Sequence, residues 1–152
     1  MKTVDYKTLY GTDDKSRLIA LQEEHQNHFG NHDDLRVFSA SGRVELCGNH
    51  TDHQRGRVLA AAVNLDMQAA VRENGTDTVR ILSQGYPMIC MALSDLRVKP
   101  EQYNSTLSLI RGVAARFTEL GCKVGGFDAY IESTVLPGSG SVSYTHLRAH
   151  ET

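Results

Sequence analysis

The 152-residue sequence has no tryptophan, only three prolines and three cysteines, and a net charge of −2 at pH 7. Cys47, Cys90 and Cys122 are far apart and form no Cys-x-x-Cys pair, which argues against a disulfide framework and against a cysteine zinc site. The small net charge gives no electrostatic reason to expect a nucleic acid or an anionic membrane as partner. The composition therefore favours a small-molecule ligand.

Long apolar runs are absent as well. No segment is long and apolar enough to suggest a bilayer-spanning helix. The stretch from Met1 to Lys7 lacks the apolar centre of a secretory signal. With thiols that we expect to be reduced, these features predict a cytoplasmic protein without a membrane partner.

Two segments have the spacing of amphipathic helices. The first begins after Asp13–Asp14 and ends at Gly30. Its inward face repeats at three- and four-residue spacings through Leu18, Leu21, His25 and Phe29. The second is capped by Asn104 or Ser105 and closed by Gly121, and we expect it to pack on a sheet. One face of the second helix carries Leu107, Ile110, Ala114 and Phe117.

Strand patterns occupy much of the remaining sequence. They lie at residues 36–40, 43–47, 67–72, 78–83, 88–93 and 127–132, where apolar residues 127, 129 and 131 alternate with polar ones. Val58–Val63 is a small apolar run that fits either a buried strand or a helix lining a core. Asn74–Gly75 favours a tight hairpin between the strands that flank it. Helices and strands without strict alternation predict an α+β fold, a mixed sheet packed with helices.

The segment from Gly42 to His53 is the most informative part of the sequence. It crowds a guanidinium, an amide, a carboxylate and two imidazoles into twelve residues, and all but the guanidinium follow the strand pattern at residues 43–47. Short Asn, Asp and His side chains can form forked hydrogen bonds with adjacent sugar hydroxyls. The segment therefore predicts a polyol site at the end of a strand.

Residues 42–66, GRVELCGNHTDHQRGRVLAAAVNLD, closely resemble the galactokinase signature of the GHMP small-molecule kinases. The resemblance implies a sugar site lined by Asn49, His50, Thr51 and Asp52. It also implies that Arg43 lies beside the anomeric hydroxyl, where its charge would stabilise the negative charge that develops during transfer. Asn49 stands where the family usually has glutamate, and His53 where tyrosine or asparagine is frequent, so the sugar could differ from galactose, which stays the favoured one.

A second stretch of the resemblance concerns the nucleotide. Residues 130–140 resemble the strand and the start of the family's nucleotide loop, which implies that Gly138, Ser139, Gly140 and Ser141 cradle ATP phosphates with backbone N–H groups. A flexible linker is the alternative for such a short Gly/Ser stretch. Ser83, at the end of a predicted strand, is a further candidate nucleotide contact, or else an ordinary exposed serine.

The resemblance stops inside this loop. We therefore expect residues 1–140 to form an incomplete N-terminal sugar-binding and partial ATP-binding domain, and residues 141–152 to be a non-native tail, with natural divergence as the alternative. The family's magnesium-binding serine has no secure counterpart here, and we expect its catalytic aspartate and another metal-binding acid beyond residue 152. We assign no metal ligand, and we expect the 152 residues alone to be nearly inactive.

The resemblance implies ATP-dependent, Mg²⁺-assisted phosphorylation of galactose to galactose 1-phosphate by a parent enzyme. Two alternatives stay open: a GHMP kinase for another sugar, and a sugar sensor that binds without turnover. A third interpretation takes the imidazoles as a metal site. It would use His25, His28 and His32 near a helix end, together with His50 and His53.

Overall fold

The computed structural model describes residues 3–47 and 57–135. Its helices are α1 (Tyr6–Tyr10), α2 (Ser16–Phe29), η2 (Pro100–Gln102, a 3₁₀ turn) and α3 (Thr106–Glu119). Its strands are β1 (Arg36–Cys47), β2 (Leu59–Glu73), β3 (Thr78–Ser83), β4 (Ile89–Ala92) and β5 (Phe127–Ser133). The predicted segments 36–40 and 43–47 thus form one long strand.

The strands form one five-stranded sheet in the order β1-β2-β5-β3-β4. β2 is antiparallel to β1 and to β5, β3 is parallel to β5, and β4 is antiparallel to β3. The predicted hairpin across Asn74–Gly75 is therefore wrong, although both of its strands exist and Gly75 has the expected positive φ of 68°. β5 arrives from far along the chain and lies between the two strands, so they cannot pair.

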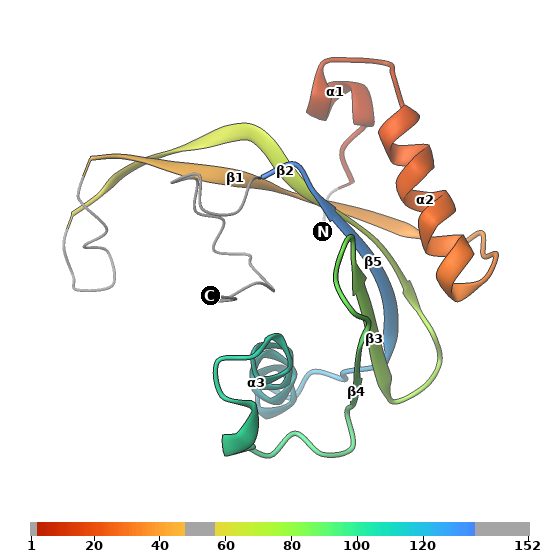
Figure 1. The fold of residues 1–152 in the computed structure, drawn as a ribbon, viewed down its shortest axis with the longest axis vertical. Coiled ribbons are helices and arrows are strands. Elements are labelled where there is room, and N and C mark those ends of the chain that lie inside the picture. Colours follow the sequence, from red (N-terminus) through yellow and green to blue (C-terminus); the bar gives the residue numbers. More distant parts are fainter. Residues whose placement is uncertain (1–2, 48–56, 136–152) are drawn as a thin grey trace.

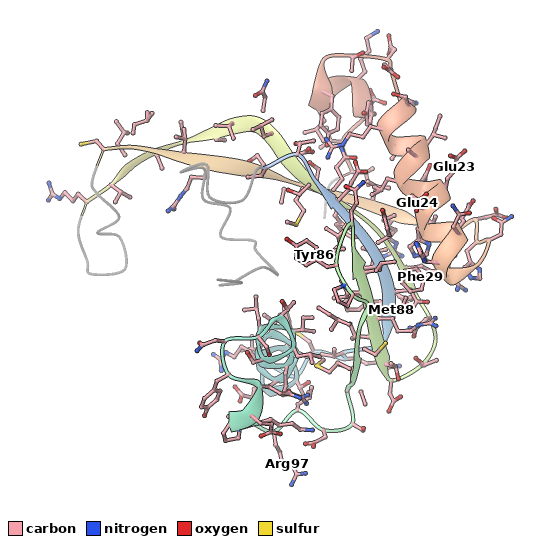
Figure 2. The ribbon with its side chains drawn as sticks, viewed as in Figure 1. Glu23, Glu24, Phe29, Tyr86, Met88 and Arg97 are labelled. Atoms are coloured by element: carbon pink, nitrogen blue, oxygen red, sulfur yellow. The ribbon has the colours of Figure 1, made fainter. Side chains whose placement is uncertain are left out.

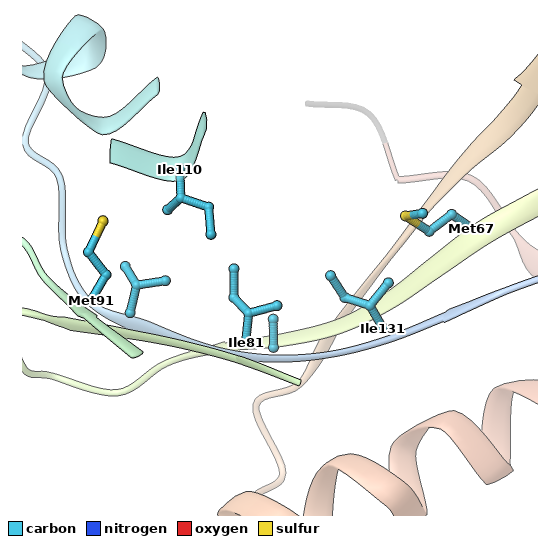
Figure 3. Close-up of a cluster of buried hydrophobic side chains, with 7 residues drawn as sticks. Met67, Ile81, Met91, Ile110 and Ile131 are labelled. Atoms are coloured by element: carbon cyan, nitrogen blue, oxygen red, sulfur yellow. The ribbon is translucent and has the colours of Figure 1, made fainter. Parts of the chain in front are cut away.

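Helices cover the two faces of this sheet (Figure 1). On one face α2 packs through Leu21 against Ala70 and Tyr130. On the other face α3 inserts Ile110 into a cluster of buried side chains (Figure 3). The other members of this cluster are Met67, Val79, Ile81, Met91, Ala129 and Ile131. Mixed strand directions with helices on both faces confirm the predicted α+β class.

The helix ends follow the predicted local chemistry. Gly30 follows α2 with φ 95°, and Gly121 lies just beyond α3 with φ 78°, conformations that glycine adopts without steric cost. The Ser105 hydroxyl accepts a hydrogen bond from the Ser108 N–H, so Ser105 is the cap of α3. Phe117, however, is 51% exposed, because it lies over the shallow groove along α3 and not in the cluster beneath it.

One burial expectation is wrong, and one strand is covered on both faces. The apolar run at 58–63 is a strand, but Leu59 is 61% exposed, because this arm of β1 and β2 extends beyond the described helices (Figure 1). In β5 the alternate polar positions are not solvated. Asp128 and Tyr130 are 1% and 5% exposed, because α2 covers their face while α3 covers the other.

Candidate functional site

Strand β1 carries Arg43, the predicted transition-state stabiliser, near the end of the long β1–β2 arm. Cys47 pairs with Leu59, so the two ends of the intervening sequence lie side by side. The four predicted sugar contacts lie within that intervening sequence. Asn49, His50, Thr51 and Asp52 all fall outside the described residues, and their roles stay predictions.

A bulge interrupts the pairing of β1 and β2 immediately before Arg43. Ser41 pairs with Asp66 and Arg43 pairs with Ala62, so residues 63–65 of β2 face the single residue Gly42 of β1. Bulges bend a strand and change the direction of the side chains that follow. Arg43 is thus the first paired residue of β1 after a change of register.

The chain just after β5 packs against Gly42. A Cβ at position 42 would lie 3.1 Å from a methyl of Val135, 3.0 Å from a methyl of Val63 and 3.2 Å from the Leu65 carbonyl oxygen. Val135 is only 2% exposed. The last described residue before the predicted phosphate loop therefore packs against the residue before Arg43, which the sequence patterns did not predict.

The predicted nucleotide contact Ser83 lies at the carboxyl end of β3, beside β5. Ser83 pairs with Ile131, and the Gln84 N–H donates to the Ile131 carbonyl at 2.8 Å. Because β3 and β5 are parallel, their carboxyl ends reach the same edge of the sheet, the place where open α/β sheets tend to bind ligands. Figure 2 shows Tyr86 in the turn after Ser83. The remaining predicted contacts, Gly138, Ser139, Gly140 and Ser141, lie outside the described residues.

A buried charge network holds β2 and β5 together next to this edge. Asp66, 5% exposed, accepts hydrogen bonds from Tyr10, from Ser39 at 2.7 Å and from Arg17 at 2.5 Å. Arg17 also donates to Glu132 of β5 at 2.6 Å. Burial opposes ionisation of Asp66, but these hydrogen bonds outweigh it and hold the pKa of the carboxyl below its ordinary value.

A second buried carboxylate, Asp128, anchors the opposite end of β5. Arg80 donates to both of its oxygens at 2.7 Å, and Asn74 donates to one of them at 2.8 Å. Burial raises the cost of its charge, yet these donors hold the pKa of Asp128 below its ordinary value. Both networks join residues that are distant in the sequence, so no local pattern indicated them.

The histidines of the alternative metal-site interpretation are not arranged as ligands where the structure describes them. His25 is fully buried, its Nε2 lies 3.4 Å from the Asp128 carbonyl oxygen, and burial lowers its pKa. His28 instead stacks on the Tyr130 ring. Within residues 3–47 and 57–135, no three His, Cys, Asp or Glu side chains form a group that could hold a metal ion. His50 and His53 lie outside those ranges.

A separate hollow lies elsewhere on the sheet. It has a volume of about 650 Å³ and lies where β1 begins and β2 ends, the end of the sheet remote from Ser83. Its lining includes Arg36, Phe38 and Lys123. No predicted site residue lines it.

Among the described helices, none is both long enough and apolar enough to cross a membrane.

Comparison with known proteins gives a consistent result. A family profile described as the galactokinase galactose-binding signature matches residues 23–73. The chain is 32% identical over 114 residues to a galactokinase of Clostridium tetani and 33% identical over 131 residues to one of Streptococcus thermophilus. These matches cover 74% and 84% of the chain but 29% and 33% of the two relatives, so the chain spans about a third of their length. The resemblance indicated by residues 42–66 is thereby confirmed.

Solved structures show the same fold. A Lactococcus lactis galactokinase complexed with galactose superposes with a TM-score of 0.70 at 24% identity, over 84% of this chain and 34% of that one. The mevalonate kinase of Methanococcus jannaschii superposes with a TM-score of 0.57 at 15% identity, over 73% of this chain and 36% of that one. The chain therefore shares the α+β fold of the matched parts of these two kinases.

Proposed function

We propose, from the premise that this chain is similar to the N-terminal third of galactokinases, that the protein carrying it phosphorylates galactose. The γ-phosphoryl group of ATP would pass to the anomeric hydroxyl and give galactose 1-phosphate. The match of residues 23–73 to the galactose-binding signature carries this proposal. That range holds β1, β2 and the sequence between them, which contains Asn49–Asp52.

The chemistry assigns a separate role to each part of the chain. Asn49, His50, Thr51 and Asp52 would hold the sugar hydroxyls, as the signature implies. Arg43 would stabilise the negative charge that develops as the anomeric oxygen attacks. The geometry supports this role, because the Val135–Gly42 contact brings the end of β5 to the residue preceding Arg43.

ATP would bind at the carboxyl edge of β3 and β5, with Ser83 and the backbone of Gly138–Ser141 around its phosphates. Parallel strand ends at that edge fit such a site. Bound Mg²⁺ would neutralise charge on the transferring phosphates. In residues 3–47 and 57–135 no three His, Cys, Asp or Glu side chains form a group that could hold a metal ion, and we assign its ligands to none of them. An enzyme that uses ATP and a free sugar would work in the cytoplasm.

One observation favours a second candidate. Asn49 replaces the glutamate that is usual in the signature, and an amide cannot offer an anionic acceptor to a hydroxyl. A kinase of the same family that prefers another sugar, such as an amino sugar or a pentose, would accommodate this change. The two candidates differ only in the acceptor, so a panel of sugars separates them.

The test is ADP release measured with galactose, an amino sugar and a pentose, in the protein expressed from the complete gene. We expect galactose to have the highest kcat/KM. Arg43→Lys should lower kcat by about 10²–10³-fold, because a lysine cannot reproduce the planar guanidinium. Arg36→Lys, on the other end of β1, is the matched control and should leave kcat unchanged. Equal rates for wild type and Arg43→Lys would refute the assigned role.

A further inference from the structure

Gly42 lies where three parts of the chain meet. It is the β1 residue opposite the bulge formed by residues 63–65, and the side chain of Val135 packs against it. A Cβ added at position 42 would have three atoms 3.0–3.2 Å away, closer than ordinary van der Waals contact. One of them is the backbone oxygen of Leu65, which cannot rotate aside. Any side chain at position 42 therefore displaces β1, β2 or Val135.

Val135 has little freedom to yield. The preceding residue, Thr134, is tied to Asp66: its N–H donates to the Asp66 carbonyl at 3.0 Å, and its hydroxyl accepts from the Asp66 N–H at 3.0 Å. The Val135 N–H itself donates to the Ser133 hydroxyl at 3.1 Å. A shift of Val135 would therefore strain hydrogen bonds that fix the end of β5 against β2.

The contact connects the residue before Arg43 with the chain that leads to the predicted phosphate loop. Gly42 is bonded to Arg43, and the sequence places Pro137–Gly138 directly after Val135 and Leu136. We propose that Gly42 is a positioning residue: its missing side chain seats Val135, which precedes the predicted phosphate loop in the sequence, against the residue before Arg43. This inference rests on the proposed function. It concerns the phosphate side of the reaction and leaves the choice of sugar untouched.

A side chain at position 42 should therefore affect catalysis more than sugar binding. In Gly42→Ala the neighbours must give by a few tenths of an ångström. Phosphoryl transfer depends on positioning, and a misplacement of 1 Å can cost about 10²-fold. We expect kcat to fall about tenfold and the KM for ATP to rise, with the KM for galactose little changed.

The experiment compares variants of the protein expressed from the complete gene. Gly42→Ala is combined with Val135→Ala, and separately with Val63→Ala, with each single variant measured to complete the double-mutant cycles. Gly112→Ala is the matched control, because an added Cβ there meets nothing within 4 Å. Steady-state kinetics give kcat and both KM values, a fluorescent ATP analogue gives nucleotide affinity, and thermal melting reports folding.

Restoration of kcat by Val135→Ala, with Gly112→Ala unaffected, would support the proposal. Restoration by Val63→Ala alone would mean that Gly42 serves only the β1–β2 pairing, and would overturn it, as would an unchanged kcat in Gly42→Ala. If Gly42→Ala fails to fold, the single variant Val135→Ala tests the proposal. Unchanged kcat and unchanged nucleotide affinity in Val135→Ala would overturn it. If the wild type phosphorylates no sugar, the proposed function is refuted. The same double-mutant cycle, measured through nucleotide affinity, still tests the role of Gly42.

Discussion

Replacing Asp66 with asparagine tests how strongly the buried charge network stabilises the fold. The Asp66 side chain is 7% exposed and accepts from Tyr10, Ser39 and Arg17. Asparagine keeps the shape but removes the charge, and it places an amide donor where one of these donors needs an acceptor. The substitution therefore breaks a buried ion pair and leaves a buried donor unpaired.

The size of the expected loss in stability follows from the burial of Asp66 and from the contacts that Arg17 keeps. Removing one partner of a buried ion pair costs about 3–5 kcal/mol. Arg17 is 28% exposed and keeps its 2.6 Å contact with Glu132, so it is not left uncompensated. We therefore expect the lower end, about 3 kcal/mol in the free energy of unfolding. For a chain of this size, this corresponds to a melting temperature lower by about 6–12 °C.

Urea and thermal unfolding at pH 7 measure this change. Asp95→Asn is the matched control, because Asp95 pairs with Lys99 and with Arg97, whose side chain lies at the surface (Figure 2), where ion pairs contribute little. We expect its melting temperature to equal that of the wild type. A change below about 0.5 kcal/mol in Asp66→Asn, far under the range for buried pairs, would refute the reasoning.

Three further predictions follow from the same contacts. The folded-state pKa of Asp66 is depressed, so its contribution to stability is present above the unfolded pKa of about 3.9 and is lost as pH falls through the folded value. The difference in the free energy of unfolding between wild type and Asp66→Asn, measured with urea, should therefore shrink below about pH 4. Arg80→Met should cost about 2 kcal/mol in urea unfolding, because Asp128 loses a bidentate partner although Arg80 is 42% exposed; no loss would contradict this. Gly126→Ala should lower stability by about 1–3 kcal/mol, since its Cβ would lie 2.5 Å from a backbone oxygen, whereas Gly125→Ala, which meets nothing within 4 Å, should not; equal melting temperatures would show that the loop yields.

The local parts of the fold could be predicted from the sequence. Ser105 caps α3 through a hydrogen bond within its own first turn, and Gly30 ends α2 through its own backbone angles. Such features depend on near neighbours in the chain, which a sequence pattern displays directly. The positions of the strands were predicted for the same reason.

The pairing of the strands could not be predicted in this way. Asn74–Gly75 carries a hairpin signal, yet β5 separates the two strands that flank it, because residues 127–133 pair with β2 and residues 128–131 with β3. Nor did alternation reveal that Asp128 is buried, since a polar residue at an alternate position normally faces solvent. Its burial depends on Arg80, 48 residues away, which compensates the charge.

The sequence displays the family motif but not the contacts around it. The resemblance of residues 42–66 indicated Arg43 and the sugar segment, and the comparisons confirm the family resemblance. These contacts join residues that are far apart in the sequence: Arg17 donates hydrogen bonds to Asp66, 49 residues away, and to Glu132, 115 residues away. The packing of Val135 on Gly42 likewise depends on the three-dimensional fold. The boundary between residues 1–140 and 141–152 stays a prediction.

The most direct test of the proposed function is the identity of the product. Phosphorus NMR of a reaction containing ATP, Mg²⁺, galactose and the protein from the complete gene would show where the phosphoryl group goes. The account predicts a sugar phosphate whose phosphorus couples to the anomeric proton, formed much more slowly by Arg43→Lys and at the wild-type rate by Arg36→Lys. A phosphate ester at another hydroxyl, or release of inorganic phosphate with no sugar ester, would contradict it.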